Sequence, residues 1–104
     1  MKQHMEALAR ANTVRLGRAQ IKRDIHDGHT TVIDVLETKP FVCDTMTICE
    51  LLQSQKRWGR KRTLKFLIRI EPTLTENRRL IHLTSRQNDA IVAALIHERN
   101  RQNV

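Results

Sequence analysis

The residues with the clearest chemical potential are the cations that surround one glycine near the middle of the chain. Residues 56–72 hold seven basic residues and one acidic residue, a net charge of +6 out of +8 for the whole chain. A glycine ahead of a helix lets the backbone approach a ligand closely, and the first N–H groups of the helix carry the positive end of its dipole. The pattern therefore favours an anionic polymer, with nucleic-acid phosphates as ligands. The cluster, together with Trp58 between its members, comprises Lys56, Arg57, Gly59, Arg60, Lys61 and Arg62.

Two smaller groups of cations accompany this cluster. Arg15, Arg18 and Lys22 follow the spacing i, i+3, i+7 and fall on one face of a helix. Arg78 and Arg79 form an adjacent pair, which fits either a further phosphate contact or a merely solvated surface. Both interpretations stay open, as do a packing role and a ligand-facing role for Trp58.

Composition limits the classes of protein to consider. The 104 residues suit one small domain, and the chain has no run of about 20 apolar residues that could span a membrane. Cys43 and Cys49 are too few for a disulfide framework, and with His26 and His29 they match no known zinc spacing. We therefore expect a cytoplasmic protein with two thiols, no metal and no cofactor. The five histidines are scattered, and we expect no enzymatic activity.

The elements that must position the cations are predicted to be helices. Three glycines, two prolines and 3% aromatic residues are too few turn-formers for an all-β fold. Residues 1–28 predict one long helix that ends in a left-handed cap at Gly28, with Gly17 marking a bend or a close approach. Residues 29–98 predict a compact domain of short helices. Residues 99–104 are polar, and we expect them to be a frayed tail.

Local signals place the short helices. A helix is expected to begin at Thr30 or Thr31 and to stop before Pro40, which begins another turn. Two capping boxes predict helix starts, Thr47-x-x-Glu50 and Thr84-x-x-Gln87. The side chains expected to face inward after these starts are Ile48, Leu51, Leu52, Ile91, Val92 and Leu95. A further helix follows Gly59, with Leu64, Leu67 and Ile68 as its apolar stripe, and ends before Pro72.

In this order and spacing, the motifs resemble a known family over roughly residues 6–97. The chain is similar to the actinobacterial integration host factor family, in which a basic-Gly-basic-x-Arg turn precedes an Arg-Arg-Leu turn and a final Arg-Gln helix. The matching segments are Met46-Thr47, Leu51-Leu52, Trp58-Gly59-Arg60-Lys61-Arg62, Asn77-Arg78-Arg79-Leu80, Leu83-Thr84-Ser85-Arg86-Gln87 and, in the first helix, Arg15, Arg18-Ala19 and Ile21-Lys22-Arg23-Asp24-Ile25.

The resemblance implies a fold and a function. It implies an all-α helix-two-turns-helix domain of four to five short helices behind a long N-terminal helix. It also implies a nucleoid-associated protein that binds double-stranded DNA with little sequence preference, bends or compacts it, and assists phage site-specific integration. Carried over by position, Gly59, Arg60 and Arg62 sit at the phosphate turn, and Arg78 and Arg79 match the paired arginines. The first helix offers Arg15, Arg18 and Lys22.

Two positions depart from the family. Asn88 stands where members often have a basic residue, and Leu83-Thr84 replaces a frequent Leu-Gly. Because phages carry host-like versions of such proteins, a bacterial and a phage origin both stay open.

We expect a monomer that acts on the DNA phosphate backbone, with an integrase or recombination complex as a further partner. Three other classes of protein share features with this chain. Formamidopyrimidine-type DNA glycosylases share the helical element, but they need a proline after the initiator Met, where this chain has Lys2-Gln3. An RNA- or ribosome-binding protein would carry a longer basic tail. A protein-interaction module would use the acidic residues 29–55, whose net charge is −3.

Overall fold

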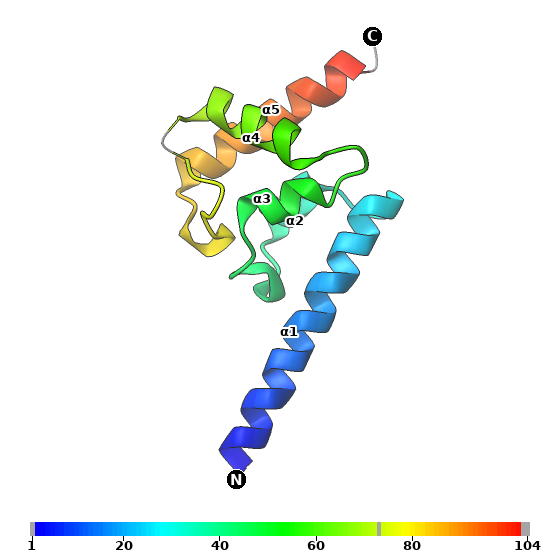
Figure 1. The fold of residues 1–104 in the computed structure, drawn as a ribbon, viewed down its shortest axis with the longest axis vertical. Helices are drawn as coiled ribbons and strands as arrows, with labels where there is room; N and C mark the ends of the chain where they lie inside the picture. The colour runs from blue at the N-terminus through cyan, green and yellow to red at the C-terminus, as the bar shows by residue number, and fades with distance from the viewer. Residues whose placement is uncertain (1, 73, 103–104) are drawn as a thin grey trace.

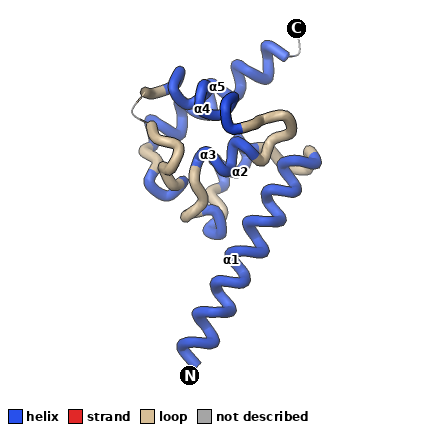
Figure 2. Tube along the Cα trace, in the orientation of Figure 1, coloured by secondary structure: helices blue, strands red, loops and turns tan. Residues whose placement is uncertain are grey.

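The chain folds into helices joined by short turns. The computed structural model describes residues 2–72 and 74–102, and within them there are five α-helices and no β-strand (Figures 1 and 2). The all-α prediction with a long first helix is confirmed. In chain order the elements are α1 (Lys2–Asp27), α2 (Val32–Thr38), the 3-10 turn η1 (Phe41–Cys43), α3 (Ile48–Gln53), α4 (Arg60–Ile70), the 3-10 turn η2 (Leu80–His82) and α5 (Ser85–Gln102).

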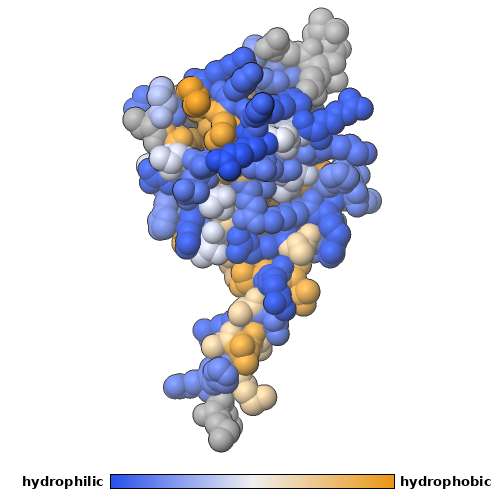
Figure 3. Space-filling model, in the orientation of Figure 1, coloured by the Kyte–Doolittle hydropathy of each residue, from blue (hydrophilic) through white to orange (hydrophobic). Residues whose placement is uncertain are grey.

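Helix α1 has the predicted bounds and projects from the body of the molecule (Figure 1). It ends at Gly28, whose φ of +83° is the left-handed geometry that favours glycine. The N–H of His29 then donates to the carbonyl of Asp24 at 2.8 Å, which satisfies one of the open carbonyls of the last turn. All of residues 3–13 are exposed, and this part of α1 stands clear of the body in the space-filling view (Figure 3), so only the second half of α1 is supported by the body.

A close approach, rather than a bend, explains the glycine in the middle of α1. A Cβ at Gly17 would lie 3.0 Å from Cγ1 of Val42 in η1, and 3.2 Å from two other atoms of the same side chain. Real Cβ atoms seldom come so near. Gly17 therefore lets α1 pack directly onto η1.

The core lies between α2, α3, α4 and α5, and α1 contributes Ile25 from its last turns. The predicted inward residues of α3 are fully buried, as is Ile91 of α5, whereas Leu95 is 5% exposed and Val92 is half-buried. The fully or nearly fully buried apolar side chains are Ile25, Val32, Val35, Leu36, Val42, Cys43, Met46, Ile48, Cys49, Leu51, Leu52, Phe66, Leu67, Leu74, Ile91 and Leu95.

The predicted apolar stripe of α4 was wrong at one position. Ile68 is 61% exposed, whereas Leu67 is buried as predicted and Leu64 is half-buried. The helix also buries Thr63 and Phe66, which were not predicted. Phe66 is drawn inward because it packs edge-on against Trp58 of the preceding turn. Thr63 tolerates full burial because its hydroxyl donates to the carbonyl of Gly59 at 2.9 Å.

Helix α5 begins as predicted and ends later than predicted. The Thr84 hydroxyl accepts the N–H of Gln87, and the Gln87 side chain accepts the N–H of Thr84, so this capping box is complete. The helix then continues to Gln102, past Arg99 where we expected a frayed tail to begin. Residues 103–104 of that predicted tail lie outside the described residues.

Candidate nucleic-acid interface

The turn between α3 and α4 presents the largest group of predicted phosphate ligands. After α3, the chain reverses at Arg57, whose φ of +69° lies in the left-handed region, and the N–H of Trp58 donates to the carbonyl of Gln55 at 3.1 Å. Gly59 then forms the N-cap of α4 in extended geometry, and no side chain caps the helix start. A Cβ on Gly59 would meet nothing within 4 Å. The first N–H groups of α4 thus have no side-chain cap, and an anion is favoured at such a helix start.

Trp58 anchors this turn to the core. Its ring contacts Phe66 with the centroids 5.1 Å apart and the planes at 76°. The guanidinium of Arg62 lies over the same ring, 4.3 Å from the centroid, which is a cation–π contact. Both contacts stiffen the turn. Of the two interpretations left open for Trp58, the structure shows packing.

The cations of the turn fall into paired and unpaired groups. Arg60 is 68% exposed and its Nη2 lies 3.1 Å from both carboxylate oxygens of Glu76. Arg62 reaches Glu98 at 3.8 Å. Lys56, Arg57 and Lys61, by contrast, take part in none of the ion pairs found among the described residues.

The second turn lies beside the first. The Arg60–Glu76 pair joins the start of α4 to the segment that carries Arg78 and Arg79. That segment is also held to the start of α3, because the N–H of Ile48 donates to the carbonyl of Arg78 at 2.8 Å and the N–H of Leu80 to the carbonyl of Met46 at 2.9 Å. Neither arginine has an ion pair among the described residues, and Arg79 is exposed. The two turns thus form one cationic edge.

A second group of cations lines an open groove between α1 and α3. The predicted ligands Arg15, Arg18 and Lys22 all lie in it, together with Arg10 and Glu50. Arg10 was not among the predicted ligands, although it lies one helical turn before Val14, which also lines the groove. Among the described residues, Arg15 makes only a local hydrogen bond, 2.9 Å from its Nη2 to the Asn12 side chain.

Glu50 neutralises part of this groove. The capping-box prediction at α3 holds for Thr47, whose hydroxyl accepts the N–H of Glu50 at 3.1 Å. The prediction was wrong for the Glu50 carboxylate, which does not turn back to Thr47. Instead Oε2 lies 3.1 Å from Arg18, and Oε1 accepts from the Lys22 ammonium. These two contacts tie α1 to α3.

The ionisation of Glu50 follows from these neighbours. Partial burial raises the pKa of its carboxyl, but the hydrogen bond from Lys22 and the charges of Lys22 and Arg18 outweigh that effect and lower the pKa from its usual 4.5. Glu50 is therefore ionised at neutral pH, and the cluster of three groups carries a net charge of +1.

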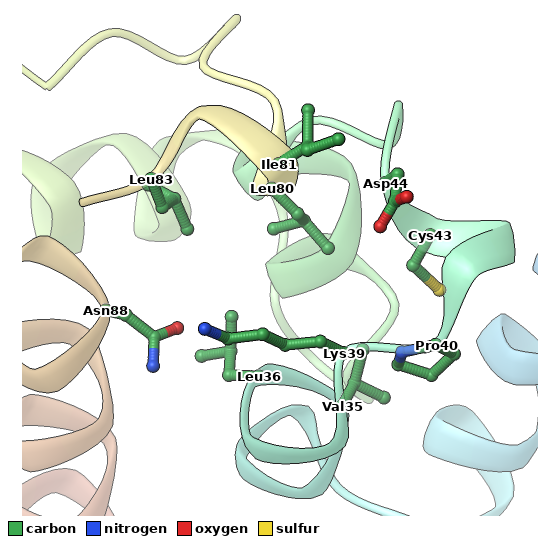
Figure 4. A pocket seen from close by; sticks show the side chains of 10 residues that line it. All are labelled: Val35, Leu36, Lys39, Pro40, Cys43, Asp44, Leu80, Ile81, Leu83 and Asn88. Atoms are coloured by element: carbon green, nitrogen blue, oxygen red, sulfur yellow. The ribbon is translucent and has the colours of Figure 1, made fainter. Parts of the chain in front are cut away.

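The hollow shown in Figure 4 offers little for chemistry. It lies between α2, η1, η2 and the start of α5; its lining is mostly apolar, and the Lys39 side chain points towards Asn88. None of the predicted phosphate ligands lines it. Burial raises the pKa of the Cys43 thiol at its edge, so this cysteine is a poor nucleophile.

The described helices carry neither a metal-binding cluster nor a membrane-spanning segment. Within the described ranges, no three His, Cys, Asp or Glu side chains gather where they could hold a metal ion. No described helix combines the length and the apolar character needed to cross a membrane.

Comparison with known proteins gives a match by structure. No family model matches the chain, and no curated protein is significantly similar to it in sequence. A solved structure of sIHF, an integration host factor, bound to an 8-bp palindromic DNA superposes with a TM-score of 0.71 at 25% sequence identity. The match covers 86% of this chain and 97% of that chain, so it extends over nearly the whole of the neighbour.

Proposed function

We propose that this chain is a nucleoid-associated protein of the integration host factor type, which binds duplex DNA through its phosphates. The observation that carries the proposal is the α3–α4 turn, where an uncapped helix start, an open glycine and three cations without an ion pair among the described residues meet. Phosphate oxygens satisfy free N–H groups and cations together. The likeness to a protein solved on DNA supports the choice of duplex DNA among possible anions.

The cations of this edge differ in whether other side chains already bind them. Lys56, Arg57 and Lys61 are free to meet phosphates, whereas Arg60 and Arg62 are held in place by Glu76, Glu98 and Trp58. Paired cations still attract DNA, but each has to leave or share its carboxylate. Phosphate contacts position a protein and carry no direct sequence information, so we expect weak sequence preference. Arg78 and Arg79 extend the same edge.

The groove of α1 supplies a second binding surface. It carries four cations against one carboxylate, and the six-residue helix α3 separates it from the basic turn. A monomer with two separate phosphate-binding surfaces can hold one duplex at two places or two duplexes at once. The first arrangement bends DNA, at a cost of about 1–6 kcal/mol, and the second bridges it. Either would assist assembly of an integrase or recombination complex on the nucleoid.

The test is a binding titration over a salt series. Fluorescence anisotropy of a labelled duplex should show log K falling against log[salt] with a slope near −5 if about six phosphates are neutralised. Unrelated duplex sequences of equal length should bind with similar affinity, and duplex DNA should compete better than A-form RNA. A slope near zero, or no binding at low salt, would remove the proposal.

Two alternatives have distinct outcomes in the same series. Preference for A-form RNA would favour an RNA-binding protein, which the basic edge also fits. Retention of a protein partner after nuclease treatment would favour an interaction module built on residues 29–55. We place DNA first because the neighbour that covers most of this chain was solved on DNA.

A further inference from the structure

The contact between α1 and α3 is made by one carboxylate and two cations. One carboxylate, Glu50, receives two cations from consecutive turns of α1, with one oxygen for Arg18 and the other for Lys22. The three side chains remain partly solvated, with 26%, 39% and 34% exposure for Arg18, Lys22 and Glu50. An ion pair this accessible is held weakly and exchanges its partners readily.

The carboxylate resembles the ligand proposed for the groove. A backbone phosphate, like a carboxylate, offers two anionic oxygens that share one charge, and Arg and Lys bind both groups. The site that Glu50 fills lies in the same groove as Arg10 and Arg15, which have no carboxylate partner among the described residues. A DNA phosphate that enters this groove therefore finds Arg18 and Lys22 already paired with Glu50.

We propose that Glu50 competes with a DNA phosphate for Arg18 and Lys22, and so limits the affinity of the α1 groove; this inference rests on the proposed function. In the free protein, Glu50 satisfies both cations and holds α1 on α3. When DNA binds, a phosphate takes over the two cations, while the packing of Gly17 on Val42 keeps α1 in place. The charge of Glu50 then lowers the affinity of the groove for DNA, and the fold stays the same.

The decisive variant is Glu50→Gln, which keeps the size of the side chain and removes its charge. We expect duplex DNA to bind this variant about three- to tenfold more tightly at low salt, which lies within the roughly two- to thirtyfold range implied by the loss of two solvated ion pairs. A matched control is Glu37→Gln, because Glu37 is exposed and makes no ion pair among the described residues. The control removes the same charge and should change the affinity much less.

A double-mutant cycle tests whether the gain in affinity depends on Arg18 and Lys22. In an Arg18→Gln/Lys22→Gln background, the Glu50→Gln substitution should bring no further gain, because the cations it releases are gone. The helical content of each variant is checked by circular dichroism. A gain in affinity is informative here, because a disrupted fold produces a loss.

Each outcome decides the inference. If Glu50→Gln binds equally or more weakly, or if its gain persists without Arg18 and Lys22, or if Glu37→Gln gains as much, the competition is refuted. These results leave the proposed function standing, because that is tested by binding of the unaltered protein to duplex DNA. Failure of the unaltered protein to bind would refute both.

Discussion

Lys61 and Arg62 are neighbours in the basic turn, and the structure predicts opposite consequences for their loss. Lys61 has no ion pair among the described residues, so its positive charge is available to a DNA phosphate. Arg62 lies over the Trp58 ring at 4.3 Å and reaches Glu98 at 3.8 Å, so its side chain chiefly stabilises the folded state. Lys61→Gln should weaken DNA binding at unchanged stability, whereas Arg62→Gln should chiefly lower stability.

The magnitudes can be worked from these contacts. One lost phosphate contact makes the salt slope less negative by about 0.9, which at 0.1 M salt is about an eightfold loss of affinity for Lys61→Gln. For Arg62→Gln, an exposed cation–π contact of about 0.5–1 kcal/mol adds to a solvent-screened ion pair near the low end of its range, about 0.2 kcal/mol. A loss of about 1 kcal/mol lowers the melting temperature by about 4–8 °C in a domain of this size.

Two assays on the same samples separate the effects. Fluorescence anisotropy over a salt series measures the affinity and its slope, and thermal unfolding followed by circular dichroism measures stability. Lys65→Gln, one turn along α4 and exposed, serves as a matched control for charge removal beyond the helix start. The reasoning is wrong if Lys61→Gln melts several degrees lower, or if Arg62→Gln keeps its stability and loses as much affinity as Lys61→Gln.

Three further predictions concern the fold and its pH dependence. Gly17→Val should lower the free energy of unfolding by an amount typical of overpacking, about 1–3 kcal/mol, and Val42→Ala in the same chain should recover part of it, as thermal unfolding of the single and double variants will show. Thr84→Ala removes the N-cap of α5 and should cost about 0.5–2 kcal/mol, measured by urea unfolding, while Thr84→Ser retains the cap and should cost less. Because the pKa of Glu50 is lowered in the folded protein, its ion pairs stabilise the fold above pH 4.5 and this contribution is lost as the pH falls through the folded value. Unfolding of the wild type and Glu50→Gln should accordingly differ by under about 1 kcal/mol at pH 7 and converge in acid; a difference that persists there would contradict the ion-pair explanation.

Helix boundaries were the part of this fold most readable from local patterns. Gly28 ended α1 because only a left-handed residue was needed there, and Thr84 with Gln87 formed a complete capping box, since both partners lie within one turn. The charge cluster around Gly59 was also visible, because it is contiguous along the chain. Interactions of this kind join residues that are near neighbours in sequence.

Interactions between residues far apart in sequence could not be predicted from local patterns. Glu50 fitted a local capping box, yet its carboxylate pairs with Arg18 and Lys22, about thirty residues earlier. Ile68 fitted the helical stripe of α4, yet the Trp58–Phe66 contact turned a different face towards the core. In both cases a local preference worth a few tenths of a kcal/mol to about 1 kcal/mol was overridden by packing or by two cations at once.

The sequence by itself determined that this chain is helical, where most helices begin, and that its excess positive charge gathers at one turn. Only the tertiary structure decided which of those cations remain free, because a carboxylate neutralises the cations that folding brings near it. Arg60 and Lys61 are adjacent in the chain and have the same formal charge, but folding brings Glu76 only to Arg60. The distances that decide an ion pair are set by how the helices pack, and packing depends on the whole chain.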